Sequence, residues 1–148
     1  MTIVPIRYVK PVFRPPSEAD SLILPVTDGC SWNQCTFCEM YTAPQKRFRP
    51  RSEEEVFESI RRCSEKFGKS IKRVFLADGD AMTLSVRRLA TVLDAIRRDL
   101  PGVRGCPAIA CRATCATSPW TSLRNWPRLG SPSCMLASSL AMTKCSRG

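Results

Sequence analysis

Two apolar runs alternate with two amphipathic helical patterns, and this order constrains the fold more than any other feature. Residues 21–27 (SLILPVT) and 71–77 (IKRVFLA) are predicted strands, and each is followed by a polar segment and then a helix. Strands that alternate with helices form parallel βα units, in which the helices cover the sheet. Chemistry in such sheets lies at the carboxyl ends of the strands. The loops at 28–51 and 78–85 are therefore the candidate functional segments.

Both predicted helices carry recognisable signals at their ends. Ser52 and Glu55 form a capping box at the start of the first helix, and Gly68 is a suitable stop. The apolar face of this helix is predicted to contain Val56, Ile60, Cys63 and Phe67. The apolar face of the second helix is predicted to contain Val86, Leu89, Leu93, Ile96 and Leu100. Pro101 ends that helix.

Acidic residues are absent from the last 49 residues of the chain, which divides it by composition. The formal net charge is +10, yet all thirteen Asp and Glu residues lie between positions 18 and 99. Average composition would place roughly six acids in a segment of that length. The same segment holds five of the nine cysteines and sustains neither a helical nor a strand period. We expect an extended lead-in at 1–20, a folded α/β domain at 21–105 and an irregular, poorly structured tail at 106–148.

Composition also excludes several classes of function. The chain has no histidine, which removes histidine-based triads, histidine-ligated zinc and imidazole acid–base catalysis. No stretch of 18 apolar residues predicts a membrane span, and the basic, proline-broken N-terminus does not look like a secretory signal. We therefore expect a cytoplasmic protein without a membrane partner. Nine cysteines in that compartment indicate metal or redox chemistry. Nucleic acid is a disfavoured partner, because the excess positive charge lies mostly in the tail.

The strongest chemical signal is a C-x4-C-x2-C cluster formed by Cys30, Cys35 and Cys38. Three thiols within nine residues can converge on one centre, and soft thiolates favour iron–sulfur clusters, zinc or Cu(I). Three ligands on a four-iron cluster leave one iron open. An open iron can bind a substrate or a cofactor.

The segment TDGCSWNQCTFCEMY resembles the cluster loop of radical S-adenosylmethionine (SAM) enzymes. It is most similar to the branch with four residues between the first two cysteines, which resembles tetrapyrrole-type oxidases and cyclases. The resemblance implies that Cys30, Cys35 and Cys38 hold a [4Fe–4S] cluster whose open iron chelates the amino and carboxylate groups of SAM. It also implies that Phe37 packs near the adenine.

The turn Asp78-Gly79-Asp80 occupies the place of the family's Gly-Gly-Glu-like second motif, which binds the SAM amino group. The resemblance covers roughly residues 20–104. It implies an α/β fold, the N-terminal half of a partial (β/α)6 TIM-like barrel. It further implies that a reduced cluster cleaves SAM to a 5′-deoxyadenosyl radical, which removes a hydrogen atom from an unknown small-molecule or macromolecular substrate. The electron would come from a donor such as ferredoxin or flavodoxin. We assign no side chain of this chain as catalytic.

Family members continue beyond residue 105 with further βα units and a Leu-Glu-Ser-Gly type motif, and the tail lacks both. Residues 131–146 can be back-translated with codons whose frame, shifted one base earlier, encodes LTILYVGLESGDDEVL. This shifted sequence contains a predicted strand and the Leu-Glu-Ser-Gly motif. We therefore hypothesise a frameshift near codons 104–106. We expect an incomplete, inactive fragment that keeps its cofactor ligands without turnover.

Other interpretations of the same residues stay open at this point. The cysteines are also compatible with a small metal module, either a four-cysteine zinc site or a plant-type ferredoxin site with Cys63 as fourth ligand. Phe37 is also compatible with a core aromatic, and Asp78 and Asp80 with a solvated turn. The basic run Lys46, Arg47, Arg49 and Arg51 is compatible with a solvated loop or with attraction of an anion.

Overall fold

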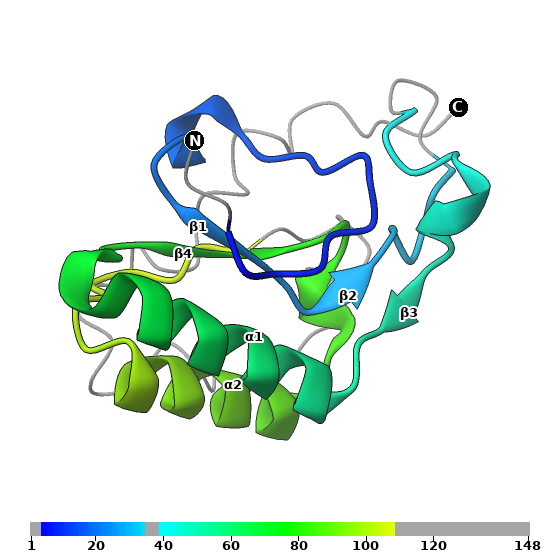
Figure 1. The fold of residues 1–148 in the computed structure, drawn as a ribbon. Helices are drawn as coiled ribbons and strands as arrows, with labels where there is room; N and C mark the ends of the chain where they lie inside the picture. The colour runs from blue at the N-terminus through cyan, green and yellow to red at the C-terminus, as the bar shows by residue number, and fades with distance from the viewer. Residues whose placement is uncertain (1–3, 35–38, 109–148) are drawn as a thin grey trace.

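The computed structural model describes residues 4–34 and 39–108 of the chain (Figure 1). Its main elements follow one another in the order β1 (Leu22–Pro25), α1 (Glu53–Phe67), β4 (Val74–Ala77) and α2 (Val86–Asp99). The segment between β1 and α1 contains the short strands β2 (Thr27–Asp28) and β3 (Arg49–Pro50). Short 3-10 helices lie at Pro16–Glu18, Pro44–Lys46, Gly68–Ser70 and Ala81–Thr83.

β1 and β4 pair in parallel, with Leu22 opposite Val74 and Pro25 opposite Ala77. The other edge of β4 pairs in parallel with a third extended segment at 105–108. The Leu76 amide donates to the Pro107 carbonyl at 2.8 Å across that edge. The predicted parallel α/β class is confirmed. The sheets are small and close no barrel within the described ranges, so the partial (β/α)6 barrel stays a prediction.

α1 and α2 lie side by side along one face of the β1–β4 sheet (Figure 1). The predicted apolar positions of α1 point inward, with Val56, Ile60 and Cys63 buried and Phe67 partly buried against the core. In α2 the predicted Leu89, Leu93 and Ile96 are buried, together with Val92 and Ala95. In the described ranges, no helix combines the length and apolarity that a membrane crossing requires.

The capping signals at the helix ends form as the sequence predicts. The Glu55 amide donates to Ser52 Oγ at 3.2 Å, and the Ser52 amide donates to Glu55 Oε2 at 3.1 Å. Gly68 follows α1 with a φ of +51°, a conformation that a residue without a Cβ adopts at low cost. The sequence reading missed one cap, Ser85, whose Oγ accepts the Arg88 amide at 3.3 Å.

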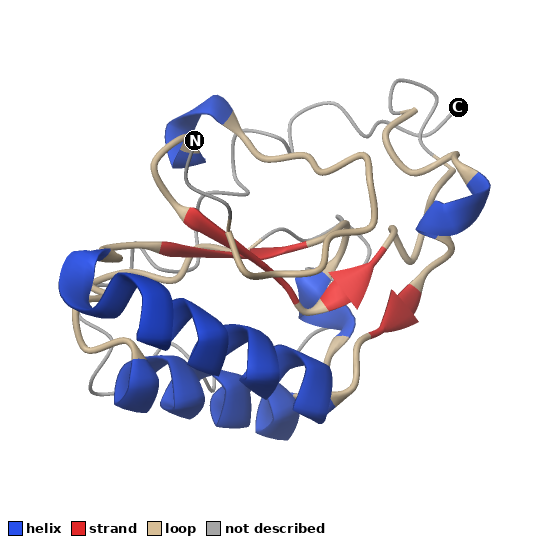
Figure 2. Ribbon diagram, in the orientation of Figure 1, coloured by secondary structure: helices blue, strands red, loops and turns tan. Residues whose placement is uncertain are grey.

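The described part of the lead-in is irregular but anchored to the sheet (Figure 2). The Tyr8 hydroxyl donates to the Ile23 carbonyl at 2.9 Å. The Glu18 carboxylate is buried and accepts hydrogen bonds from Ser21 at 2.5 Å and from Arg73 at 2.7 Å. Two charged or polar partners compensate the desolvation of this carboxylate, so the lead-in is held at the start of both strands.

The capping box gives a first testable prediction. Ser52→Ala leaves the Glu55 amide without its acceptor and should lower the free energy of unfolding by about 1 kcal/mol. Urea unfolding followed by circular dichroism measures this change. Ser70→Ala, at an exposed position, is the matched control and should change the free energy by less than about 0.5 kcal/mol. Equal effects of the two substitutions would contradict a capping role for Ser52.

Candidate metal and cofactor site

The two candidate loops meet at the carboxyl edge of the sheet. Asp78 follows β4 directly, and Cys30 lies two residues beyond β2. The Asp78 amide donates to the Thr27 carbonyl at 3.2 Å, which extends the β1–β4 pairing beyond the strands. The Ser31 hydroxyl donates to Asp80 Oδ2 at 2.5 Å. The start of the cysteine loop and the Asp78–Asp80 turn are thus in direct contact.

Gly79 is a point of close approach between the backbones of these two loops. It has a φ of +86°, and a Cβ built on it would overlap the Gly29 carbonyl and lie 2.7 Å from the Cys30 amide nitrogen. Gly29 itself has a φ of +72° and lies against the carbonyl of Lys46. Neither close approach accommodates a side chain, because the obstructing atoms belong to the backbone.

The structure places four of the predicted site residues together: Cys30, Asp78, Gly79 and Asp80. Cys30 is half-buried, whereas both carboxylates are buried, with exposures of 3% for Asp78 and 0% for Asp80. The alternative interpretation, a solvated turn, is therefore wrong for both acids. Cys35, Phe37 and Cys38 lie outside the described residues. No group of three metal-binding side chains occurs among the residues that are described, so the three-cysteine centre stays a prediction.

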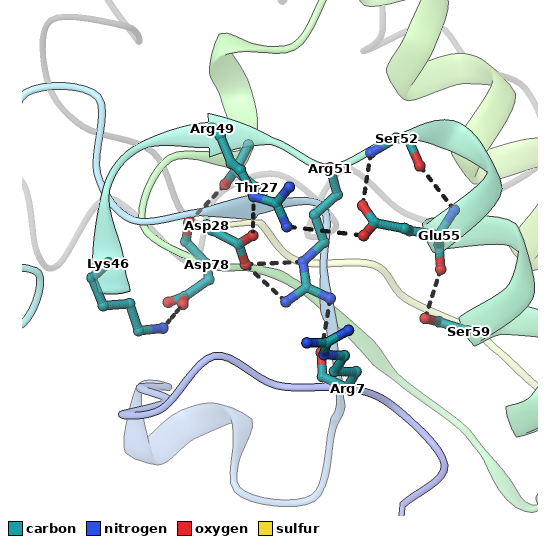
Figure 3. A network of polar contacts seen from close by, with 10 residues as sticks. All are labelled: Arg7, Thr27, Asp28, Lys46, Arg49, Arg51, Ser52, Glu55, Ser59 and Asp78. Carbon is teal, nitrogen blue, oxygen red and sulfur yellow. Dashed lines mark hydrogen bonds and ion pairs between the residues drawn. The ribbon is translucent and has the colours of Figure 1, made fainter. Parts of the chain in front are cut away.

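Asp78 forms a buried ion pair with Lys46, whose side chain is fully buried (Figure 3). The ammonium group binds Oδ2. Within the described part of the chain, Oδ1 accepts no well-formed hydrogen bond. Burial raises the pKa of Asp78 above its ordinary value, and the nearby Asp28 raises it further, whereas Lys46 and the Tyr41 hydroxyl act in the opposite direction. Lys46 makes the largest of the contributions that lower the pKa of Asp78 and so favour its charged form.

A second buried carboxylate, Asp28, anchors the base of the cysteine loop (Figure 3). Its Oδ1 accepts hydrogen bonds from Arg51 Nε at 2.9 Å and Nη2 at 2.8 Å, and its Oδ2 accepts one from Arg49 Nε at 3.0 Å. Arg51 Nη1 also donates to the Arg7 carbonyl at 2.8 Å. This network joins the lead-in to both ends of the cysteine loop.

These contacts correct the interpretation of the basic run. The expectation of a solvated loop is wrong for Lys46 and Arg51, which are buried beside Asp78 and Asp28. A buried carboxylate requires a counter-charge, and each of these cations supplies one. The remaining members of the run, Arg47 and Arg49, are exposed. The signal that sequence reasoning missed is that both acids directly follow apolar strands, where a buried acid needs a cation from another segment.

Cys63 is a core residue of α1 and not a member of the site. Its side chain is fully buried in the hydrophobic core, as the sequence reading favoured. Burial raises its pKa to about 11, so the thiol is protonated at neutral pH. Metal ligation needs the thiolate. This placement argues against Cys63 as the fourth ligand of a ferredoxin-type site.

The close approach at Gly79 gives a second prediction. Gly79→Ala should destabilise the chain by at least about 1–3 kcal/mol, because alanine is strained at this φ before any overlap is counted. Thermal or urea unfolding measures the change. Gly105→Ala is the control, since a Cβ at Gly105 meets nothing within 4 Å. If Gly79→Ala is as stable as the wild type, the two loops do not pack as described.

The Lys46–Asp78 pair gives a third prediction. Lys46→Met leaves a buried carboxylate unpaired and should cost about 3–5 kcal/mol at neutral pH. Without the ammonium the pKa of Asp78 rises further, so the unfolded chain loses this proton at lower pH than the folded one. The loss of unfolding free energy in Lys46→Met, relative to the wild type, should therefore become smaller as the pH falls towards 3.8, the ordinary pKa of the carboxyl group.

Urea titrations between about pH 4 and pH 7.5 test this dependence. Lys69→Met removes the same charge from an exposed site and should change the free energy by less than about 0.5 kcal/mol at every pH. A deficit in Lys46→Met that does not vary with pH would contradict the assignment of a charged Asp78.

Comparison of the chain with protein-family models, with curated proteins and with solved structures finds no match in any of the three.

Proposed function

We propose that this chain is the cofactor-binding part of a radical SAM protein. In this proposal Cys30, Cys35 and Cys38 ligate a [4Fe–4S] cluster, and the Asp78–Asp80 turn binds the amino group of SAM. The observation that carries the proposal is the packing of Gly79 on the Gly29–Cys30 backbone, which brings a buried carboxylate next to the first predicted cluster ligand.

The donor groups suit these two cofactors. Thiolates are the usual ligands of iron–sulfur clusters, and a charged carboxylate binds an ammonium group. Asp78 keeps one carboxylate oxygen, Oδ1, without a well-formed hydrogen bond from the described residues. Ser31 orients Asp80 from the cysteine loop. When bound and reduced, the cluster and SAM supply a 5′-deoxyadenosyl radical that abstracts hydrogen from a substrate.

The strand order supports a partial (β/α)6 barrel as the finer fold. β1, β4 and the segment 105–108 lie next to one another in chain order and run parallel. A parallel barrel grows in this way, each strand joining the one before it after a covering helix.

Anaerobic reconstitution with iron and sulfide tests the proposal without requiring turnover. The wild-type chain should bind about four irons. Its reduced form should give an electron paramagnetic resonance signal that changes when SAM is added. Cys30→Ala should lose the iron and the signal, whereas Cys63→Ala should keep both, because Cys63 lies in the core of α1.

Other outcomes separate the competing functions. About one zinc per chain with no response to SAM would replace the proposal by a small cysteine-ligated metal module. About two irons, lost also in Cys63→Ala, would favour a ferredoxin-type site. A melting curve of each unloaded variant verifies that loss of iron reflects a missing ligand and not unfolding.

A further inference from the structure

We propose that Lys46 is a positioning residue for SAM, acting only through Asp78. Its ammonium holds Asp78 Oδ2 and favours the charged, oriented carboxylate, so that Oδ1 can accept the ammonium group of the ligand once the side chains that cover it move. This inference rests on the proposed function and assigns a role to a lysine that contacts no cofactor itself.

The first support is that Lys46 is fixed at both its backbone and its side chain. It ends the 3-10 helix Pro44–Lys46, and its amide donates to the Ala43 carbonyl at 2.8 Å. Its carbonyl lies against Gly29, at a distance that leaves no room for a side chain there. Its ammonium lies 5.9 Å from the centre of the Tyr41 ring. The side chain therefore reaches Asp78 from a constrained position.

The second support is the burial of the pair. The side-chain exposures are 0% for Lys46 and 4% for Asp78, so neither charge is solvated by bulk water. An ammonium ligand needs a charged carboxylate, and a carboxylate in this environment stays charged only beside a cation. Within the described part of the chain, Lys46 is the cation that forms an ion pair with Asp78.

The third support is the division of the two carboxylate oxygens. Lys46 occupies Oδ2, and Oδ1 accepts no well-formed hydrogen bond among the described residues, although the Tyr41 hydroxyl also interacts with this carboxylate and favours its charged form. Oδ1 has less than 1 Å² of accessible surface, so a ligand reaches it only when the side chains that cover it move. A carboxylate held at Oδ2 keeps its orientation during such a movement.

The experiment compares three ligands on the anaerobically reconstituted full chain by equilibrium dialysis. SAM carries an ammonium and a carboxylate, decarboxylated SAM carries only the ammonium, and 5′-methylthioadenosine carries neither. Lys46→Met should weaken SAM and decarboxylated SAM alike, by about 10- to 100-fold, the value of one charged hydrogen bond. Binding of 5′-methylthioadenosine should not change. Lys46→Arg should recover part of the loss, and Lys69→Met should behave as the wild type.

A double-mutant comparison keeps the test valid if Lys46→Met folds poorly. Lys46→Met/Asp78→Asn removes both charges of the pair and leaves no unpaired ion, whereas Asp78→Asn alone leaves the buried Lys46 ammonium without its carboxylate. If Lys46 acts through Asp78, the double variant should bind SAM no more weakly than Asp78→Asn alone. The melting temperatures of the unloaded variants give a readout that is independent of the cofactors.

Four results would overturn the inference. A loss confined to SAM and absent with decarboxylated SAM would mean that Lys46 binds the ligand carboxylate directly. Unchanged SAM binding in a folded Lys46→Met chain, or a further loss in the double variant, would also exclude action through Asp78. A wild-type chain that takes up no cluster overturns the proposed function itself, and the inference with it. The wild-type control thus separates the two failures.

Discussion

Backbone hydrogen bonds between β1 and β4 determine which residues of this chain can meet. The two strands are parallel and paired along their whole length, with Ile23 opposite Phe75 and Leu24 opposite Leu76. The cysteine loop and the Asp78–Asp80 turn follow the carboxyl ends of these strands and therefore lie at the same edge of the sheet. Two glycines then allow the loop backbones to touch, since a Cβ at Gly29 or Gly79 would collide with main-chain atoms. The site is consequently a property of the sheet register, and a shift of one residue would separate its parts.

Buried acidic residues at both ends of these strands pair with basic residues from distant parts of the sequence. Asp78 pairs with Lys46, Asp28 with Arg51 and Glu18 with Arg73. Such a pair adds little net stability compared with apolar residues, but losing one member leaves an uncompensated charge. Each pair is therefore retained or lost as a unit. Together they fix the lead-in and the cysteine loop against the strands.

Local signals in the sequence were sufficient for the secondary structure. The capping box at Ser52 and the apolar spacing in α1 and α2 depend on residues three or four positions apart, and the structure confirms both. The parallel pairing also followed from the alternation of strands and helices. These features could be predicted from the sequence because each depends on a short stretch of chain.

The burial of Lys46 and Arg51 in the basic run could not be predicted from local sequence signals. Lys46 and Asp78 are 32 residues apart, and nothing near Lys46 indicates that it lies beneath a turn formed after β4. Arg51 and Asp28 are 23 residues apart and present the same difficulty. Charge alone suggests solvent exposure, and only the tertiary fold decides otherwise. The presence of Cys30 and the Asp78–Asp80 turn at one edge was predictable, whereas the cation that accompanies Asp78 was not.

The position of β4 between two parallel neighbours also affects how the chain can be shortened. All four residues of β4 are buried and apolar, and among the described residues its second edge pairs with the short segment 105–108. Removing that segment would expose a row of unpaired amides and carbonyls on an uncharged Val-Phe-Leu-Ala strand. Exposed edges of this kind recruit strands from other molecules. Poor solubility of a chain cut before Gly105 would therefore reflect intermolecular sheet growth at β4, even with every residue of the candidate site still present.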